Sequence, residues 1–243
     1  MIKEALQYIV GLGKAEITEV VLPDGIKGMY SDKPLNRLET PMPLASELTF
    51  HTLTGLVDYI KSGTDAMLPK MLLEVQSPTK VKLYSQLNDK RKREYLVEAC
   101  AMIPSFRFDE FREHEAFCIG VQSKFINTGD REVVLQFAGT VENGTVAQYS
   151  DDGVTQKATI KTGIASKASA IVPNPVVLKP YRTFLEVEQP ESSFIFRMKE
   201  SNSEITCALF EADGGAWQME AMQNIKEYLQ NELKDMEQFV VIA

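Results

Sequence analysis

The chain has 243 residues, a formal net charge of −8 and an apolar fraction of 44%, a composition typical of a globular protein with its own hydrophobic core. No apolar run reaches the ~18 residues that a membrane-spanning helix needs, and the charged N-terminal stretch does not resemble a signal peptide. We therefore expect a cytoplasmic protein with no membrane partner. The acidic balance argues against duplex DNA as a partner, because DNA binding favours a basic surface.

The first part of the chain alternates helical and extended patterns. Apolar residues recur at helical spacing over residues 2–10, and residues 16–32 have the pattern of a β-hairpin. A second helix is predicted over residues 53–60, with Thr49 or Thr52 as its cap.

The remaining elements follow from periodicity and turn residues. In chain order, we expect an antiparallel strand meander over 70–102, a helix over 111–126, a strand over 131–141, an extended arm over 157–180, strands over 181–189, 192–200 and 204–212, a helix over 216–236 and a strand over 239–243.

Short turns between successive strands favour an antiparallel sheet. We predict an α+β fold with a mixed, mainly antiparallel sheet, helices packed on one face and a long C-terminal helix. The chain is expected to form one domain, with a sub-division into residues 1–130 and 131–243 left open. The arm over 157–180 contains prolines and is expected either to cross a neighbouring subunit or to connect parts of one domain.

Residues able to perform catalysis are sparse in this sequence. The two histidines, His51 and His114, are too few for a histidine-rich metal site and are expected on the surface or at helix ends. The three cysteines are scattered, and we expect them to be buried free thiols. Neither an HExxH nor a GxSxG motif occurs. We therefore expect no metal and no cofactor, and an enzyme is the less favoured class.

The turn before the last helix, EADGGAWQME, is one candidate binding site. Gly214 and Gly215 could leave backbone amides bare beside the indole of Trp217, an arrangement that suits an anionic or nucleotide ligand. The alternative is a strand-to-helix turn in which Asp213 caps the helix and Trp217 is buried in the core.

The run Lys90, Arg91, Lys92 and Arg93 is the other candidate binding site. At a predicted hairpin tip, it could contact a nucleic acid or a nucleotide phosphate. The alternative is a solvated turn that keeps an edge strand from aggregating.

Four blocks of the sequence carry a family resemblance. They are MIKEALQYIVGL, TLTGLVDYIKS, the block from Val172 to Met198 and the block from Ala208 to Leu229. With these blocks the chain resembles an uncharacterised family encoded by phages and prophages of Gram-positive bacteria and, more remotely, the prophage YfdQ-like family. The resemblance implies a non-structural phage product that acts in the host cytoplasm, and it assigns no catalytic residue.

Together these observations favour a non-catalytic, homo-oligomeric bacteriophage protein that binds a host or phage component. It would evade host immunity by sequestering a nucleotide signal or by occluding a host defence protein. The alternatives are an accessory factor in phage DNA recombination or replication, acting through Lys90 to Arg93, and a hydrolase whose acidic residues converge only in the folded protein.

Overall fold

A computed structural model describes most of the chain. The described residues are 2–23, 25–31, 37–38, 45–88, 90–142, 145–151, 156–162, 166–172, 174–201 and 204–243. The chain forms two compact units. Unit 1 comprises Met1–Ser46 and Leu87–Glu94, and unit 2 comprises Glu47–Gln86 and Tyr95–Ala243. The sub-division near residue 130 stays a prediction.

Unit 1 contains a helix and a small sheet. Its elements are α1 (Ile2–Gly13), β1 (Ile17–Val21), β2 (Lys27–Ser31) and β3 (Arg37–Leu38). The strands are antiparallel in the order β1-β2-β3, so the expected hairpin is confirmed. No residue of α1 is buried, and both hydrophobic clusters among the described residues lie in unit 2.

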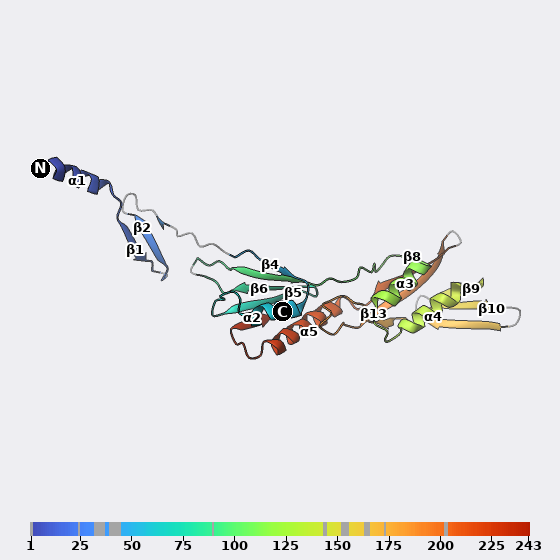
Figure 1. Ribbon diagram of the computed structural model, residues 1–243. Helices are drawn as coiled ribbons and strands as arrows, with labels where there is room; N and C mark the ends of the chain where they lie inside the picture. Colours follow the sequence, from blue (N-terminus) through green and yellow to red (C-terminus); the bar gives the residue numbers. More distant parts are fainter. Residues whose placement is uncertain are drawn as a thin grey trace. The chain divides into compact units, whose positions relative to one another are not determined.

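The first hydrophobic cluster of unit 2 lies between one face of a five-stranded sheet and two helices (Figure 1). The elements are β4 (Leu48–Phe50), α2 (Leu53–Ser62), β5 (Met71–Ser77), β6 (Lys80–Ser85), β7 (Tyr95–Cys100), α5 (Ala216–Glu232) and β15 (Phe239–Ile242). The strand order is β15-β5-β6-β7-β4, and the two outer pairs are parallel. The inner meander is antiparallel, as expected.

Local signals in the sequence account for the ends of α2. The hydroxyl of Thr52 accepts a hydrogen bond from the backbone amide of Gly55 at 3.0 Å, and Gly63 ends the helix in the left-handed conformation. Between these caps Leu53, Leu56 and Ile60 recur at helical spacing and are buried against the sheet. The prediction of this helix is confirmed.

The second hydrophobic cluster of unit 2 lies between a four-stranded antiparallel sheet and two further helices. The elements are β8 (Arg112–Glu113), α3 (His114–Lys124), α4 (Arg131–Glu142), β12 (Val176–Leu178), β13 (Ser192–Ser201) and β14 (Glu204–Glu211), and the strand order is β12-β13-β14-β8. A separate antiparallel sheet consists of β9 (Thr145–Asp151), β10 (Gln156–Thr162) and β11 (Ser166–Val172).

Residues 131–141 form the helix α4, so the predicted strand is wrong there. Val134, Phe137 and Ala138 are buried and lie at helical spacing. The apolar run VVLQFA is compatible with a strand as well as a helix, and packing against the second cluster decides the outcome.

Two further segments differ from the expectation. Tyr181 to Gln189, expected to be a strand, has no regular secondary structure. The region 157–180, expected to be an extended arm, contains all but the first residue of β10 together with β11 and β12. β10 pairs with β9 on one side and β11 on the other. This pairing satisfies backbone groups that an isolated arm would leave to water.

The α+β class with mainly antiparallel sheets is confirmed. The register and burial of the five-stranded sheet place α2 and α5 on the same face. The last helix, α5, has 17 residues and ends at Glu232, earlier than the predicted residue 236.

Candidate functional site

A pocket of about 620 Å³ lies within unit 2, and we call it the Trp217 pocket. Its volume is within the usual range for small-molecule sites. The residues that line it come from six separate parts of the chain: Ser77–Thr79 at the β5–β6 turn, Ile103–Phe106 with Phe108, Lys124 at the end of α3, Pro180–Arg182, Glu211 at the end of β14, and Trp217 with Gln218 in the first turn of α5.

One wall of the Trp217 pocket belongs to a loop that the buried side chain of Gln189 holds together. The amide oxygen of Gln189 accepts hydrogen bonds from the backbone N–H groups of Arg182 and Thr183 at 2.9 and 3.1 Å. Its amide nitrogen donates to the carbonyl oxygens of Phe184 and Val187. Because the loop has no strand partner for these groups, Gln189 takes the place of a β-ladder.

A second set of contacts attaches the same loop to the first hydrophobic cluster. The hydroxyl of Thr183 donates to the carbonyl oxygen of Pro78, and the ring of Phe184 is part of the cluster. The loop thereby places Arg182 between the elements that surround the pocket.

Arg182 is the most unusual residue of the pocket, because it is a cation with only 5% of its surface exposed. Its guanidinium carbon lies 3.9 Å from the ring centroid of Trp217, a close cation–π contact. Nη1 donates to Glu211 at 2.6 Å, and Nη2 donates to the Ser192 hydroxyl. Nε is buried and has no hydrogen-bond partner among the described residues.

The electrostatics of the pocket follow from this burial. Desolvation lowers the pKa of Arg182 to about 10, although Glu211 and Asp213 oppose the shift. Desolvation also raises the pKa of Glu211, against the effect of the guanidinium. Burial would raise the pKa of Asp213 as well, but hydrogen bonds from Ser192 and Gly215 and the Arg182 charge leave that pKa lowered. Arg182 is therefore still a cation at neutral pH, with two acids beside it.

Only part of the predicted site at Gly214, Gly215 and Trp217 lies in the pocket. Trp217 lines the pocket and is half-buried, whereas Gly214 and Gly215 are not among the lining residues. Both glycines have positive φ values, 64° and 82°, and a Cβ atom on either would meet nothing within 4 Å. The turn requires these positive φ values, which glycine adopts without strain. The amide of Gly215 already donates a hydrogen bond to the Asp213 carboxylate at 2.9 Å, so it is not open to a ligand.

The predicted basic site, Lys90 to Arg93, lies in the β6–β7 connection and belongs to unit 1. The side-chain oxygen of Asn88 accepts hydrogen bonds from the backbone amides of Lys90 and Lys92. Arg91 and Lys92 are exposed, and Arg91 has a left-handed φ of 58°. Residues 90–93 thus belong to a turn on which Arg91 and Lys92 are exposed cations.

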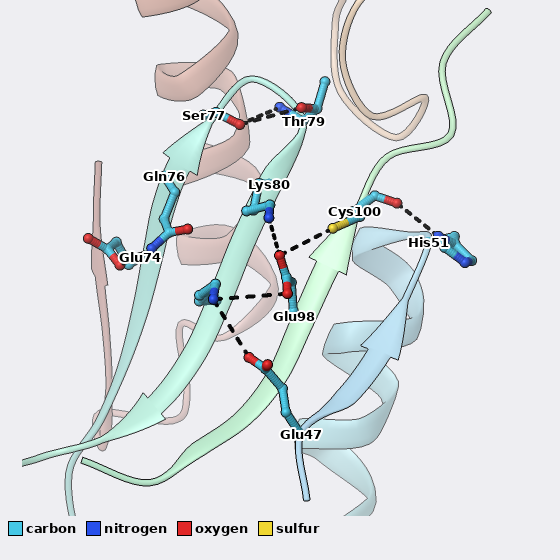
Figure 2. A network of polar contacts seen from close by, with 10 residues as sticks. Glu47, His51, Glu74, Gln76, Ser77, Thr79, Lys80, Glu98 and Cys100 are labelled. Atoms are coloured by element: carbon cyan, nitrogen blue, oxygen red, sulfur yellow. Dashed lines mark hydrogen bonds and ion pairs between the residues drawn. The ribbon is translucent and has the colours of Figure 1, made fainter. Parts of the chain in front are cut away.

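The outer face of the five-stranded sheet carries a polar network (Figure 2). Glu98 forms an ion pair with Lys80 and accepts from the thiol of Cys100, whose carbonyl oxygen lies 3.1 Å from Nδ1 of His51. The hydrogen bond from Lys80 lowers the pKa of Glu98, although desolvation opposes it, while burial raises the pKa of Cys100. The thiol therefore stays protonated at neutral pH, and the network stabilises the sheet surface.

The other two thiols have different surroundings. All three cysteines are free, as expected, but only Cys207 is fully buried, and desolvation raises its pKa to about 12. Cys118 lies 3.6 Å from Nε2 of His114. His114 is buried as the first residue of α3, so it lies at a helix end, one of its two expected placements, and not on the surface. Among the described residues, no three potential ligands gather to hold a metal.

Three residues of the Trp217 pocket were not predicted from the sequence. Lys124, Arg182 and Glu211 belong to α3, an irregular loop and β14, and no motif joins them. The position of Arg182 between the aromatic residues Tyr181 and Phe184 was its one local signal.

Comparisons of the chain with protein-family models, curated proteins and solved structures find no match. Within the described residues, no helix is both long and apolar enough to span a membrane.

Proposed function

We propose that this protein is a non-catalytic bacteriophage protein that binds a nucleotide-type small molecule in the Trp217 pocket. In this role it withholds a nucleotide signal from a host defence system. The observation that carries the proposal is the buried Arg182 stacked on Trp217, beside a pocket that also presents Lys124. Charged groups with shifted pKa values in a concave site are typical of functional sites.

The chemistry of the lining favours binding over catalysis. The described lining residues include aromatic rings, hydroxyl groups, two cations and the carboxylate of Glu211, but neither histidine nor cysteine. Glu211 is held by Arg182 and has no neighbouring base in the lining. A flat ring can stack on the aromatic groups while an anionic group meets a cation, as nucleotides require.

The phage setting of the proposal rests on the resemblance of the four sequence blocks. A homo-oligomeric protein of the host cytoplasm agrees with that setting. Occlusion of a defence protein, DNA binding through Lys90 to Arg93, and hydrolysis are the competing functions, and they differ in their measurable outcomes.

Trp217 makes a direct test possible, because it is the one tryptophan of the chain. We expect GMP or AMP, added to the purified full-length protein, to change its tryptophan fluorescence saturably. Chromatography after heat denaturation is expected to recover the nucleotide intact. The Lys124→Met variant should bind more weakly than wild type, while Lys234→Met, which changes an exposed lysine of the α5–β15 connection, should bind normally.

The competing functions predict other results. Conversion of the nucleotide over time would identify an enzyme and contradict sequestration. Salt-dependent binding of single-stranded DNA that weakens in an Arg91→Ala, Lys92→Ala variant would favour the DNA function. No fluorescence or calorimetric response to either nucleotide at millimolar concentration would refute the proposal.

A further inference from the structure

The ligand's hydrogen-bonding pattern can be inferred from which polar groups of the Trp217 pocket are already occupied. The Arg182 guanidinium donates to Glu211 and Ser192 and has one face on Trp217, and its side chain is only 6% exposed. Arg182 therefore holds Glu211 and Trp217 in position and presents little of its own surface to a ligand. It acts as a positioning residue.

Glu211 differs from Arg182, because 35% of its side-chain surface is exposed. One carboxylate oxygen accepts from Arg182, and the second accepts from no donor among the described residues. An ionised carboxylate only accepts hydrogen bonds. The part of a ligand that meets Glu211 must accordingly carry N–H or O–H donors, and a phosphate group there would be repelled.

Lys124 supplies the complementary group. Its ammonium donates to the carbonyl oxygen of Ser105, while an ammonium has three donors in total. Lys124 is partly exposed, and Phe106 and Phe108 line the same pocket. A ligand with a flat ring, donors on one edge and an anionic group elsewhere can satisfy the aromatic rings, Glu211 and Lys124 together.

From this pattern we infer that the Trp217 pocket takes a guanine nucleotide, with the N1–H and N2–H₂ edge of the base on Glu211 and the phosphate on Lys124. Guanine is the common nucleobase that presents two adjacent N–H donors on one edge. Adenine presents its amino group between ring nitrogens that only accept, so a carboxylate beside it makes one hydrogen bond and repels the neighbouring lone pair. This inference rests on the proposed nucleotide-binding function.

The test is a set of titrations of the full-length protein with GMP, AMP, guanosine and inorganic phosphate, followed by tryptophan fluorescence. We expect GMP to bind about tenfold or more tightly than AMP, since a bidentate contact to a base discriminates by about that much. Guanosine should bind more weakly than GMP. The Lys124→Met variant should weaken GMP binding and leave guanosine binding unchanged.

Glu211→Gln should remove most of the GMP preference, because the new amide offers one acceptor and one donor. The matched control is Glu188→Gln, which changes an exposed, lysine-paired glutamate outside the pocket. Thermal unfolding of each variant verifies that it is folded, and the wild-type preference decides the inference even if Glu211→Gln does not fold.

The outcomes separate the inference from the proposed function. Equal affinity for GMP and AMP, or tighter AMP binding, would overturn the guanine assignment and leave nucleotide binding intact. Absence of binding by GMP, AMP and guanosine would overturn both.

Discussion

At the scale of single residues, Arg182 shows how a buried charge is tolerated and what it positions. Desolvation lowers its pKa to about 10, which means that burial disfavours the charged form. The ion pair with Glu211, the hydrogen bond to Ser192 and the face of Trp217 compensate for the lost hydration. Arg182 stabilises the folded protein only while these partners are present. Removing one member of the ion pair leaves the other charge buried without compensation, which lowers the free energy of unfolding.

Replacing Arg182 by alanine is expected to lower the free energy of unfolding by about 2–3 kcal/mol. The value lies below that for a fully buried pair, since Glu211 is partly exposed and solvent screens it. Urea denaturation followed by tryptophan fluorescence measures the change, and the emission of Trp217 should shift as its face is uncovered. Arg107→Ala, which breaks a pair at 73% and 60% exposure, is the matched control and should cost less than about 0.5 kcal/mol. Equal effects of the two substitutions would contradict this account.

At the scale of elements, the loop from Pro180 to Gln189 is ordered without belonging to a sheet. Four hydrogen bonds of the Gln189 side chain to the backbone replace the ladder that the predicted strand would have made. This loop contributes both Arg182 to the pocket and Phe184 to the first hydrophobic cluster. A change in the packing of the first hydrophobic cluster around this loop would therefore also change the shape of the Trp217 pocket.

Gln189→Ala is expected to destabilise the protein by about 2–4 kcal/mol, because buried backbone donors and acceptors lose their partner. The substitution should also reduce nucleotide binding, since the loop positions Arg182. Thermal unfolding and the GMP titration measure the two effects. Gln223→Ala, which removes an exposed side-chain contact on α5, is expected to change neither. A fully stable Gln189→Ala variant would show that the loop does not depend on this side chain.

At the scale of the whole molecule, both hydrophobic clusters of the described residues belong to unit 2. α5 and β15, at the C-terminal end, complete the first of these clusters. The hydrophobic contribution to stability, which scales with buried apolar area, is therefore concentrated in unit 2.

Deleting residues 1–46 is accordingly expected to leave a cooperative unfolding transition with little change in its midpoint. Deleting residues 216–243, which removes α5 and β15, should abolish that transition because the sheet loses its cover. Circular dichroism during urea denaturation distinguishes the two. Loss of cooperativity in the first deletion would show that unit 1 is needed for the stability of the rest.

Elements whose signals are local can be predicted from the sequence alone. The caps and apolar stripe of α2 and the turns of the strand meander are encoded within a few residues, because capping and periodicity act over one or two turns. The α+β class followed from the same signals.

Elements and contacts that depend on residues distant in the chain were apparent only in the folded protein. VVLQFA became helical because Val134 and Phe137 pack into the second cluster. The 181–189 segment became a loop because Gln189 satisfies its backbone. The Trp217 pocket also depends on residues that are distant in the chain. Lys124, Arg182, Glu211 and Trp217 lie on four different elements, and only the packing of those elements brings a cation, a carboxylate and an indole together.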